Sequence, residues 1–231
     1  MIKLENISKT FYIKKKPFKI LKKINLKVKK NEIFGLIGNT GCGKTTLLRI
    51  MSGFIQPDEN NIIRKFDHLE SSMIFQNFNL LNNLNVFENA ALPLKLRNFS
   101  KKKIISRINY LLEYFKLKKF KKAYPNQISG GQKQKISIIR ALSIYPKIIF
   151  CDEPTSSLDS YSSYEILKLI KEINNNFKTT IVLVSHDISI IKNLCHRVAI
   201  LEKGEIIKEI ILKNKFENLK FISYEQALNN F

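Results

Sequence analysis

One stretch constrains the fold of this chain more than any other: it runs Gly38-Asn39-Thr40-Gly41-Cys42-Gly43-Lys44-Thr45-Thr46 and fits the pattern G-x-x-x-x-G-K-[ST]. An apolar segment, residues 32–37, precedes it, and residues 46–51 follow with apolar positions spaced as on a helix. A strand, a glycine-rich loop and a helix N-terminus in this order place backbone N–H groups around an anion. The stretch therefore predicts a nucleotide phosphate site. The alternative, a glycine-rich turn with a solvated lysine, fits these flanks less well.

Residues of this loop have distinct expected roles. Gly41 and Gly43 can adopt backbone angles that residues with a side chain resist, which lets the main chain wrap closely round a phosphate. Lys44 is expected to reach the β- and γ-phosphates, and the hydroxyl of Thr45 to ligate Mg²⁺.

Length and composition indicate one soluble domain with a full core. The chain has 231 residues, of which 44% are hydrophobic and 26% charged. No apolar run approaches the roughly 20 residues that span a bilayer. The first six residues alternate like a strand and do not resemble a signal peptide. We therefore expect the chain in the cytosol.

The chain is strongly basic, with 40 Lys and Arg against 19 Asp and Glu, a net charge of +21. Such an excess is typical of nucleic-acid or anionic-membrane surfaces. The lysines are spread along the whole chain, however, and no recognised nucleic-acid-binding signature accompanies them. Nucleic-acid binding is therefore not expected, whereas a place near anionic lipid head groups is favoured. The three cysteines and three histidines show no metal-binding spacing, so we expect free thiols.

The order of elements predicts an α/β fold with a P-loop NTPase core and a mostly parallel sheet. An N-terminal antiparallel layer is expected from strands at residues 2–7 and 24–28, joined by a basic loop from Ile13 to Lys19. Residues 77–127 predict a helical insertion, with one helix interrupted at Pro93 and the next capped by Ser100. The whole is expected to be a single domain, with a helical subdomain at about 77–140 and a short C-terminal tail at about 212–231.

Two adjacent acids end a wholly apolar predicted strand, Ile148-Ile149-Phe150-Cys151-Asp152-Glu153. At the carboxyl end of a buried strand beside the phosphate loop, Asp152 is suited to hold Mg²⁺ through water. Glu153 then stands where a carboxylate can accept a proton from attacking water. An acidic turn after a strand is the alternative, and it would be favoured if no phosphate loop came before it.

Three further polar positions are candidate residues of the nucleotide site. Ser129-Gly130-Gly131-Gln132 begins a predicted helix and forms either a second anion site or a simple helix cap. His186 follows the strand 181–184, either contacting a γ-phosphate or standing as a surface residue. Gln76, also at a strand end, is suited to place water or to ligate the metal.

The ordered set of motifs resembles the nucleotide-binding subunits of ABC transporters, and the match runs from Ile2 to about Lys208. The resemblance implies ATP as the nucleotide and two copies paired head to tail, with each ATP between the phosphate loop of one copy and the Ser129 segment of the other. It implies an adenine-stacking role for Phe11, with Tyr12 as the neighbouring candidate, and a place for Asp159 in the dimer interface. The expected nucleotide-binding residues are Phe11, Gly38, Asn39, Thr40, Gly41, Cys42, Gly43, Lys44, Thr45, Thr46, Ser129, Gly130, Gly131, Gln132 and Asp159; the metal-binding ones are Thr45, Gln76 and Asp152; the catalytic ones are Lys44, Gln76, Glu153 and His186.

The resemblance also implies partners: a membrane permease on which the helical insertion docks, and a substrate-binding protein. The chain would lie on the cytoplasmic face of the inner membrane. Segments at 73–81, 91–96 and 124–134 resemble the ATPases of methionine importers, although related ATPases share parts of them. Two alternatives stay open. One is the ATPase of a lipoprotein-release or cell-division complex, and the other is a non-transport ABC module. Phe78, Leu80, Leu81 and Phe87, expected to be exposed, favour a protein partner.

The chain departs from the pattern of this family in four places. Ile128 replaces leucine, and Lys135 replaces arginine, which keeps the charge but loses the planar fork. The span from Lys44 to Gln76 is shorter than expected by about a dozen residues, so the antiparallel layer is expected to be reduced. The chain ends at Phe231 without the ligand-sensing domain of many methionine-importer ATPases, so feedback inhibition is expected to be absent. A reconstituted transporter that still stopped at high internal methionine would contradict this.

Overall fold

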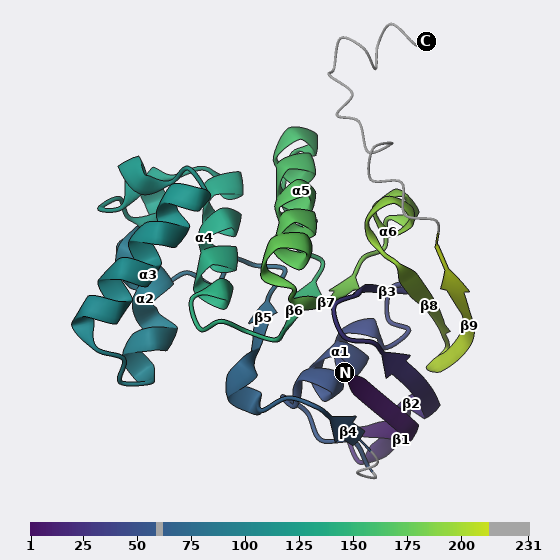
Figure 1. The fold of residues 1–231 in the computed structure, drawn as a ribbon. Coiled ribbons are helices and arrows are strands. Elements are labelled where there is room, and N and C mark those ends of the chain that lie inside the picture. The colour runs from purple at the N-terminus through teal and green to yellow at the C-terminus, as the bar shows by residue number, and fades with distance from the viewer. Residues whose placement is uncertain (59–61, 213–231) are drawn as a thin grey trace, which may run out of the picture.

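A mixed six-stranded sheet forms the centre of the structure, a computed structural model that describes residues 1–58 and 62–212 (Figure 1). The first five strands in spatial order are parallel, and the last is antiparallel to its neighbour. The order is β5 (Ser71–Ile74), β6 (Ile148–Asp152), β7 (Thr180–Val184), β3 (Ile33–Ile37), β8 (Arg197–Glu202) and β9 (Glu205–Ile211). The expected α/β fold with a mostly parallel sheet is confirmed.

Strands β6 and β7 are apolar except for Asp152 and Thr180 at their ends, because both faces of the sheet are covered there. Successive side chains of a strand point to opposite faces. In β6, Ile148 and Phe150 pack into the core shared with the antiparallel layer, whereas Ile149 and Cys151 pack into the core beneath the helices on the other side. All residues of β6 and β7 are buried.

A second, antiparallel sheet of three strands contains the N-terminus, in the order β2 (Lys16–Val28), β1 (Ile2–Ile13) and β4 (Ile62–Arg64). The prediction of a basic loop at 13–19 is wrong. The two strands continue to a two-residue turn at Lys14 and Lys15, whose φ angles are 48° and 64°. Two left-handed residues in succession are typical of a type I′ turn, whose twist matches that of paired strands. Two lysines are not typical of this turn, which favours Asn-Gly or Asp-Gly, and the sequence analysis therefore did not predict the hairpin.

In the described part of the chain, six α-helices and three short 3₁₀ turns connect the strands (Figure 1). In Figure 1, α2, α3 and α4 lie together on one side of the molecule, and α5 stands between them and the sheet-rich half. The helices are α1 (Lys44–Ser52), α2 (Val86–Leu96), α3 (Lys101–Tyr114), α4 (Gly130–Leu142), α5 (Ser160–Phe177) and α6 (Ile188–Leu194). The 3₁₀ turns are His68–Glu70, Lys118–Phe120 and Pro125–Gln127.

Two expectations about the helical region need correction. Helix α2 runs through Pro93 without interruption, because its buried residues Ala90, Ala91 and Leu94 continue one packed face on both sides of the proline. Of the four apolar side chains expected to be exposed, only Leu81 is, at 44%. Phe78, Leu80 and Phe87 are half-buried, and the last two pack against the core.

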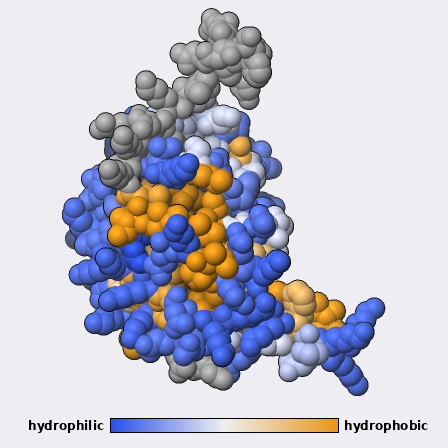
Figure 2. Space-filling view, turned by 90° about the vertical axis from the view of Figure 1, so that its right-hand side faces the viewer, coloured by the Kyte–Doolittle hydropathy of each residue, from blue (hydrophilic) through white to orange (hydrophobic). Residues whose placement is uncertain are grey.

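The surface near β9 shows hydrophobic residues gathered among hydrophilic ones (Figure 2). Within residues 1–58 and 62–212, no helix combines the length and the apolar character that crossing a membrane would require. The predicted C-terminal tail, apart from Leu212, lies outside the described residues.

Candidate functional site

The phosphate loop connects β3 to α1 in the predicted strand–loop–helix order. Gly41 and Gly43 have φ angles of 80° and 108°, in the region that favours glycine. A side chain at Gly38 would place its Cβ 2.0 Å from the carbonyl oxygen of Leu201, so the approach of β8 requires glycine there. The Lys44 ammonium donates to the carbonyl oxygens of Gly38 and Asn39, at 2.8 and 3.0 Å, and so holds the loop from inside.

The N-terminus of α1 is arranged to receive an anion. Gly43 is its N-cap, and no side chain among the described residues caps the first turn. The first turn also contains no acidic residue. Backbone N–H groups at a helix start have no intrahelical partner and carry partial positive charge. A phosphate group therefore fits this end of α1.

The Thr45 hydroxyl donates to Oδ1 of Asp152 at 3.0 Å, which joins the start of α1 to the end of β6. Asp152 is only 6% exposed, and burial, the largest cause, raises the pKa of its carboxyl against the hydrogen bond from Thr45. A nearby cation would favour the ionised form. The described residues contain no cluster of three or more His, Cys, Asp or Glu side chains that could hold a metal by itself. A hydroxyl and one carboxylate fit Mg²⁺, which keeps water and phosphate oxygens as its other ligands.

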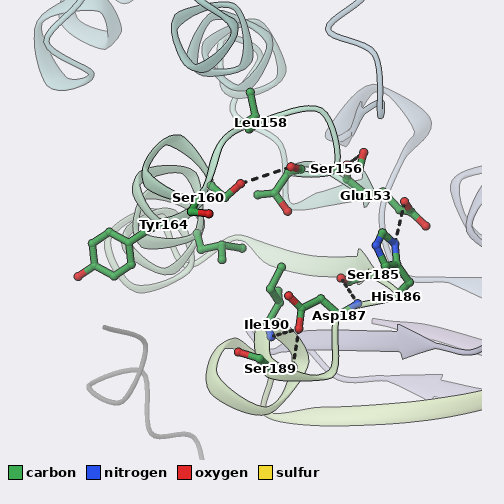
Figure 3. A pocket seen from close by; sticks show the side chains of 13 residues that line it. Glu153, Ser156, Leu158, Ser160, Tyr164, Ser185, His186, Asp187, Ser189 and Ile190 are labelled. Carbon is green, nitrogen blue, oxygen red and sulfur yellow. Dashed lines mark hydrogen bonds and ion pairs between the residues drawn. The ribbon is translucent and has the colours of Figure 1, made fainter. Parts of the chain in front are cut away.

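Glu153 and His186 form a pair at the adjoining strand ends. Oε2 of Glu153 lies 3.1 Å from Nδ1 of His186 (Figure 3). The backbone N–H of Glu153 donates to the carbonyl oxygen of Val184 at 3.1 Å, and its φ of 47° turns the chain out of the strand direction. The main chain of Glu153 is thereby held to β7, and its carboxylate contacts the side chain of His186, which follows β7.

This pair stands between two cavities. One is the phosphate-loop cleft, lined by Ile20, Thr40, Gly41, Gly43, Lys44, Thr45, Thr46, Gln76, Glu153 and His186. The other contains several hydroxyl groups, from the segment after β6, from α5 and from the start of α6 (Figure 3). Glu153 and His186 line both, so water can reach the carboxylate from either side. The position of Ile20 in the first cleft was missed, because nothing in the sequence distinguishes it from other strand residues.

Other predicted site residues lie outside that cleft within one chain. The Ser129 hydroxyl caps α4, accepting from the N–H of Gln132 at 3.3 Å, and the Gln132 side chain accepts from the N–H of Ser129 at 2.9 Å. Asp159 likewise caps α5, accepting from the N–H and the hydroxyl of Ser162. Phe11 lies on β1, 36% exposed, paired in register with Phe18. Within the monomer, Ser129 and Asp159 therefore act as helix caps, and Phe11 is a residue of a paired strand.

The loop that follows Gln76 is held by two side chains that the sequence analysis missed. Asn89, fully buried in α2, accepts from the N–H of Leu81 at 2.8 Å and donates to the carbonyl oxygens of Leu81, Leu84 and Asn85. Arg140 of α4 donates to the carbonyl oxygens of Phe78 and Asn79, at 2.9 and 2.6 Å. The loop is therefore tied to both helices, and no sequence pattern marks either residue.

We expect Asn89→Ala to lower the free energy of unfolding by about 2 to 4 kcal/mol, because several loop backbone groups lose their buried partner. Urea unfolding followed by circular dichroism measures the change. Asn193→Ala is the matched control, since Asn193 is half-buried and its side chain donates to the carbonyl oxygen of Ser189, one turn back on its own helix. Equal stability of the two variants would contradict the assignment of Asn89 as the anchor of this loop.

Comparison with known proteins extends these observations. The family described as "ABC transporter" matches residues 21–156. The methionine import ATP-binding protein MetN 1 of Staphylococcus aureus (strain bovine RF122 / ET3-1) is 40% identical over 233 residues, which cover 95% of this chain and 68% of that protein. MetN of Clostridium tetani (strain Massachusetts / E88) is 37% identical over 248 residues, covering 100% of this chain and 77% of that protein.

Two solved structures share the fold. The ATP-binding cassette MJ0796, in a dimeric post-hydrolysis state bound to ADP and Pi, has a TM-score of 0.82 at 32% identity, covering 93% of this chain and 100% of its own. The protein cbiO1 from Clostridium perfringens, part of the ABC transporter complex cbiONQ, has a TM-score of 0.82 at 24% identity, covering 99% of this chain and 93% of its own, and supports the fold alone. Together with the phosphate loop and the acids that follow β6, these likenesses decide the question: the chain belongs to the ABC transporter family and is an ATPase.

Proposed function

We propose that this ATPase powers the import of methionine or a related amino acid through a separate membrane permease, with a substrate-binding protein delivering the substrate. The observation that carries the proposal is the 40% identity to a methionine import ATP-binding protein across 95% of the chain. In such a complex the chain would lie on the cytoplasmic face of the membrane.

The site residues have separate tasks in this proposal. Lys44 and the backbone N–H groups of the loop bind the phosphates of ATP, replacing the loop carbonyls as the partners of the ammonium. Thr45 and Asp152, with Gln76, would hold Mg²⁺, which neutralises charge on the phosphates when bound. Glu153 accepts the proton of the attacking water, and His186 orients the Glu153 carboxylate and contacts the γ-phosphate.

The Ser129 segment acts, in this proposal, on the ATP held by a second copy of the chain. Within one chain, the Ser129 segment is not among the described residues that line the phosphate-loop cleft. Gly131 packs closely against Ser162 of α5, so the segment and Asp159 present one continuous surface. The dimeric state of MJ0796 supports a head-to-tail pair of this kind. The helical subdomain at about 77–140 is then the part that docks on the permease.

We expect Ser129→Ala to slow steady-state ATP hydrolysis on the order of 100-fold, while the affinity of dilute monomer for a fluorescent ATP analogue stays the same. A hydroxyl that stabilises phosphate charge across the dimer is lost only when two copies meet. Ser100→Ala is the matched control, since Ser100 caps α3 by the same type of bond. Equal hydrolysis by both variants would reduce Ser129 to a helix cap.

Co-purification tests the import function. The Glu153→Gln chain, tagged and extracted from native membranes in mild detergent with ATP and Mg²⁺, is expected to bring a small permease, and the substrate-binding partner of that permease is expected to bind methionine. A permease with a large extracytoplasmic domain would instead identify a lipoprotein-release or cell-division complex. Absence of any membrane protein would overturn the transport function and leave an ABC-type ATPase.

A further inference from the structure

The end of the β1–β2 hairpin exposes large apolar side chains. Tyr12 is 74% exposed, Ile13 62% and Phe18 54%, although all three are in paired strands. Because side chains alternate across a sheet, Ile13 and Phe18 lie on one face of the hairpin, and Tyr12 and its partner Pro17 on the other. The end is therefore apolar on both faces rather than on one. In Figure 2 this end of the antiparallel sheet projects from the body of the molecule.

Lysines surround this projection. Lys14, Lys15 and Lys16 form the turn and begin β2, and all three are exposed. Among the described residues none forms an ion pair with them, and the sequence has no acidic residue between Glu5 and Glu32. Positive charge without an ion-pair partner, beside exposed apolar side chains, is complementary to an anionic partner with an apolar interior.

We propose that this hairpin tip, residues 12–18, inserts shallowly into an anionic lipid surface, with Ile13, Tyr12 and Phe18 at the boundary between head groups and acyl chains. Aromatic rings favour that boundary, and lysine stems can extend from it so that their ammonium groups meet lipid phosphates. Each lysine near such a surface adds a favourable electrostatic contribution.

The shape of the tip favours lipid over a macromolecule. A protein partner would be expected to cover one face of a hairpin, whereas lipid surrounds both faces of a projecting end. A single-stranded nucleic acid would use the aromatic rings and the lysines but would leave the aliphatic Ile13 in water. The inference does not depend on the import function, because it concerns this chain and a lipid surface alone.

The first test measures partition of the isolated ATPase onto protein-free vesicles of phosphatidylglycerol and phosphatidylcholine at physiological salt. Lys14→Asn/Lys15→Gly removes two charges and keeps a turn sequence that favours type I′. We expect it to weaken binding to anionic vesicles about twentyfold. Lys102→Gln/Lys103→Gln on α3, the control with the same loss of charge, is expected to change it less than about threefold. Ile13→Asn, at unchanged charge, is expected to weaken it about tenfold.

Equal losses for the two double variants would mean that the net charge of the chain binds the vesicles, and would overturn the proposal. So would full binding by Ile13→Asn, because insertion requires the apolar side chain. If the hairpin variant kept its vesicle binding but lost affinity for single-stranded RNA, the tip would be a nucleic-acid contact.

The second test uses the absence of tryptophan from the sequence. In Tyr12→Trp the fluorescence reports the tip alone, and we expect a blue shift and quenching by brominated lipid on anionic vesicles. Tyr110→Trp on α3, where the replaced ring is 52% exposed, is the control and is expected to show neither. An unshifted, unquenched spectrum for Tyr12→Trp would overturn insertion even if the protein bound the vesicles.

Discussion

Glu153→Gln is expected to lower the rate of ATP hydrolysis by on the order of 10³-fold while the affinity for ATP stays within about twofold. The amide keeps the shape of the carboxylate but cannot accept a proton from water. Its oxygen can still face His186, whose Nδ1 lies 3.1 Å from the carboxylate, so the site remains assembled. Phosphate release and equilibrium binding of an ATP analogue measure the two quantities. If two copies pair as proposed, hydrolysis would no longer separate them, and size-exclusion chromatography with ATP should show a lasting dimer.

Glu202→Gln is the control for this prediction, since Glu202 is an exposed glutamate at the end of β8. Unchanged hydrolysis in Glu153→Gln would remove Glu153 as the base. A simultaneous loss of hydrolysis and ATP affinity would point to damage of the binding cleft instead of a missing proton acceptor.

Lys44→Ala is expected to abolish measurable turnover and to weaken ATP binding by on the order of 100-fold or more, because a buried charge-assisted contact to phosphate is lost. Lys44 is 7% exposed, so its charge is only weakly screened by water, and it is the one lysine in the described lining of the cleft. The same change removes the donor to Gly38 and Asn39 that holds the loop. Equilibrium binding of ATP and steady-state phosphate release measure the effect.

Lys30→Ala, an exposed lysine before β3, controls for the loss of one positive charge. Lys44→Arg separates charge from shape, because the planar guanidinium keeps the charge but does not reproduce the ammonium geometry. We expect Lys44→Arg to bind ATP better than Lys44→Ala and to hydrolyse it poorly. ATP affinity in Lys44→Ala equal to that of the unchanged chain would contradict a role for Lys44 in phosphate binding.

Local sequence patterns predicted the strands that are buried on both faces of the sheet, because a short run of apolar residues is typical of such a strand. Residues 148–151 and 181–184 are wholly apolar and form interior strands. Predictions failed where packing or pairing outweighed local propensity. Pro93 stays inside α2 because the residues around it are buried, and the lysine-rich segment after Ile13 is a hairpin because two long strands pair on either side of it.

The sequence by itself determined the phosphate loop, the acids after β6 and the family. These features depend on residue type and on spacing within a short segment, so they can be recognised without the tertiary structure. Only the tertiary structure decided which of these groups meet. It brought Thr45 to Asp152 and Glu153 to His186, held the loop after Gln76 with Asn89 and Arg140, and left Ser129 outside the cleft of its own chain. Such contacts depend on strand order and on the packing of distant helices, so no local pattern records them. The exposed hairpin tip, likewise, became visible only once both strands were paired and none of the described residues covered their end.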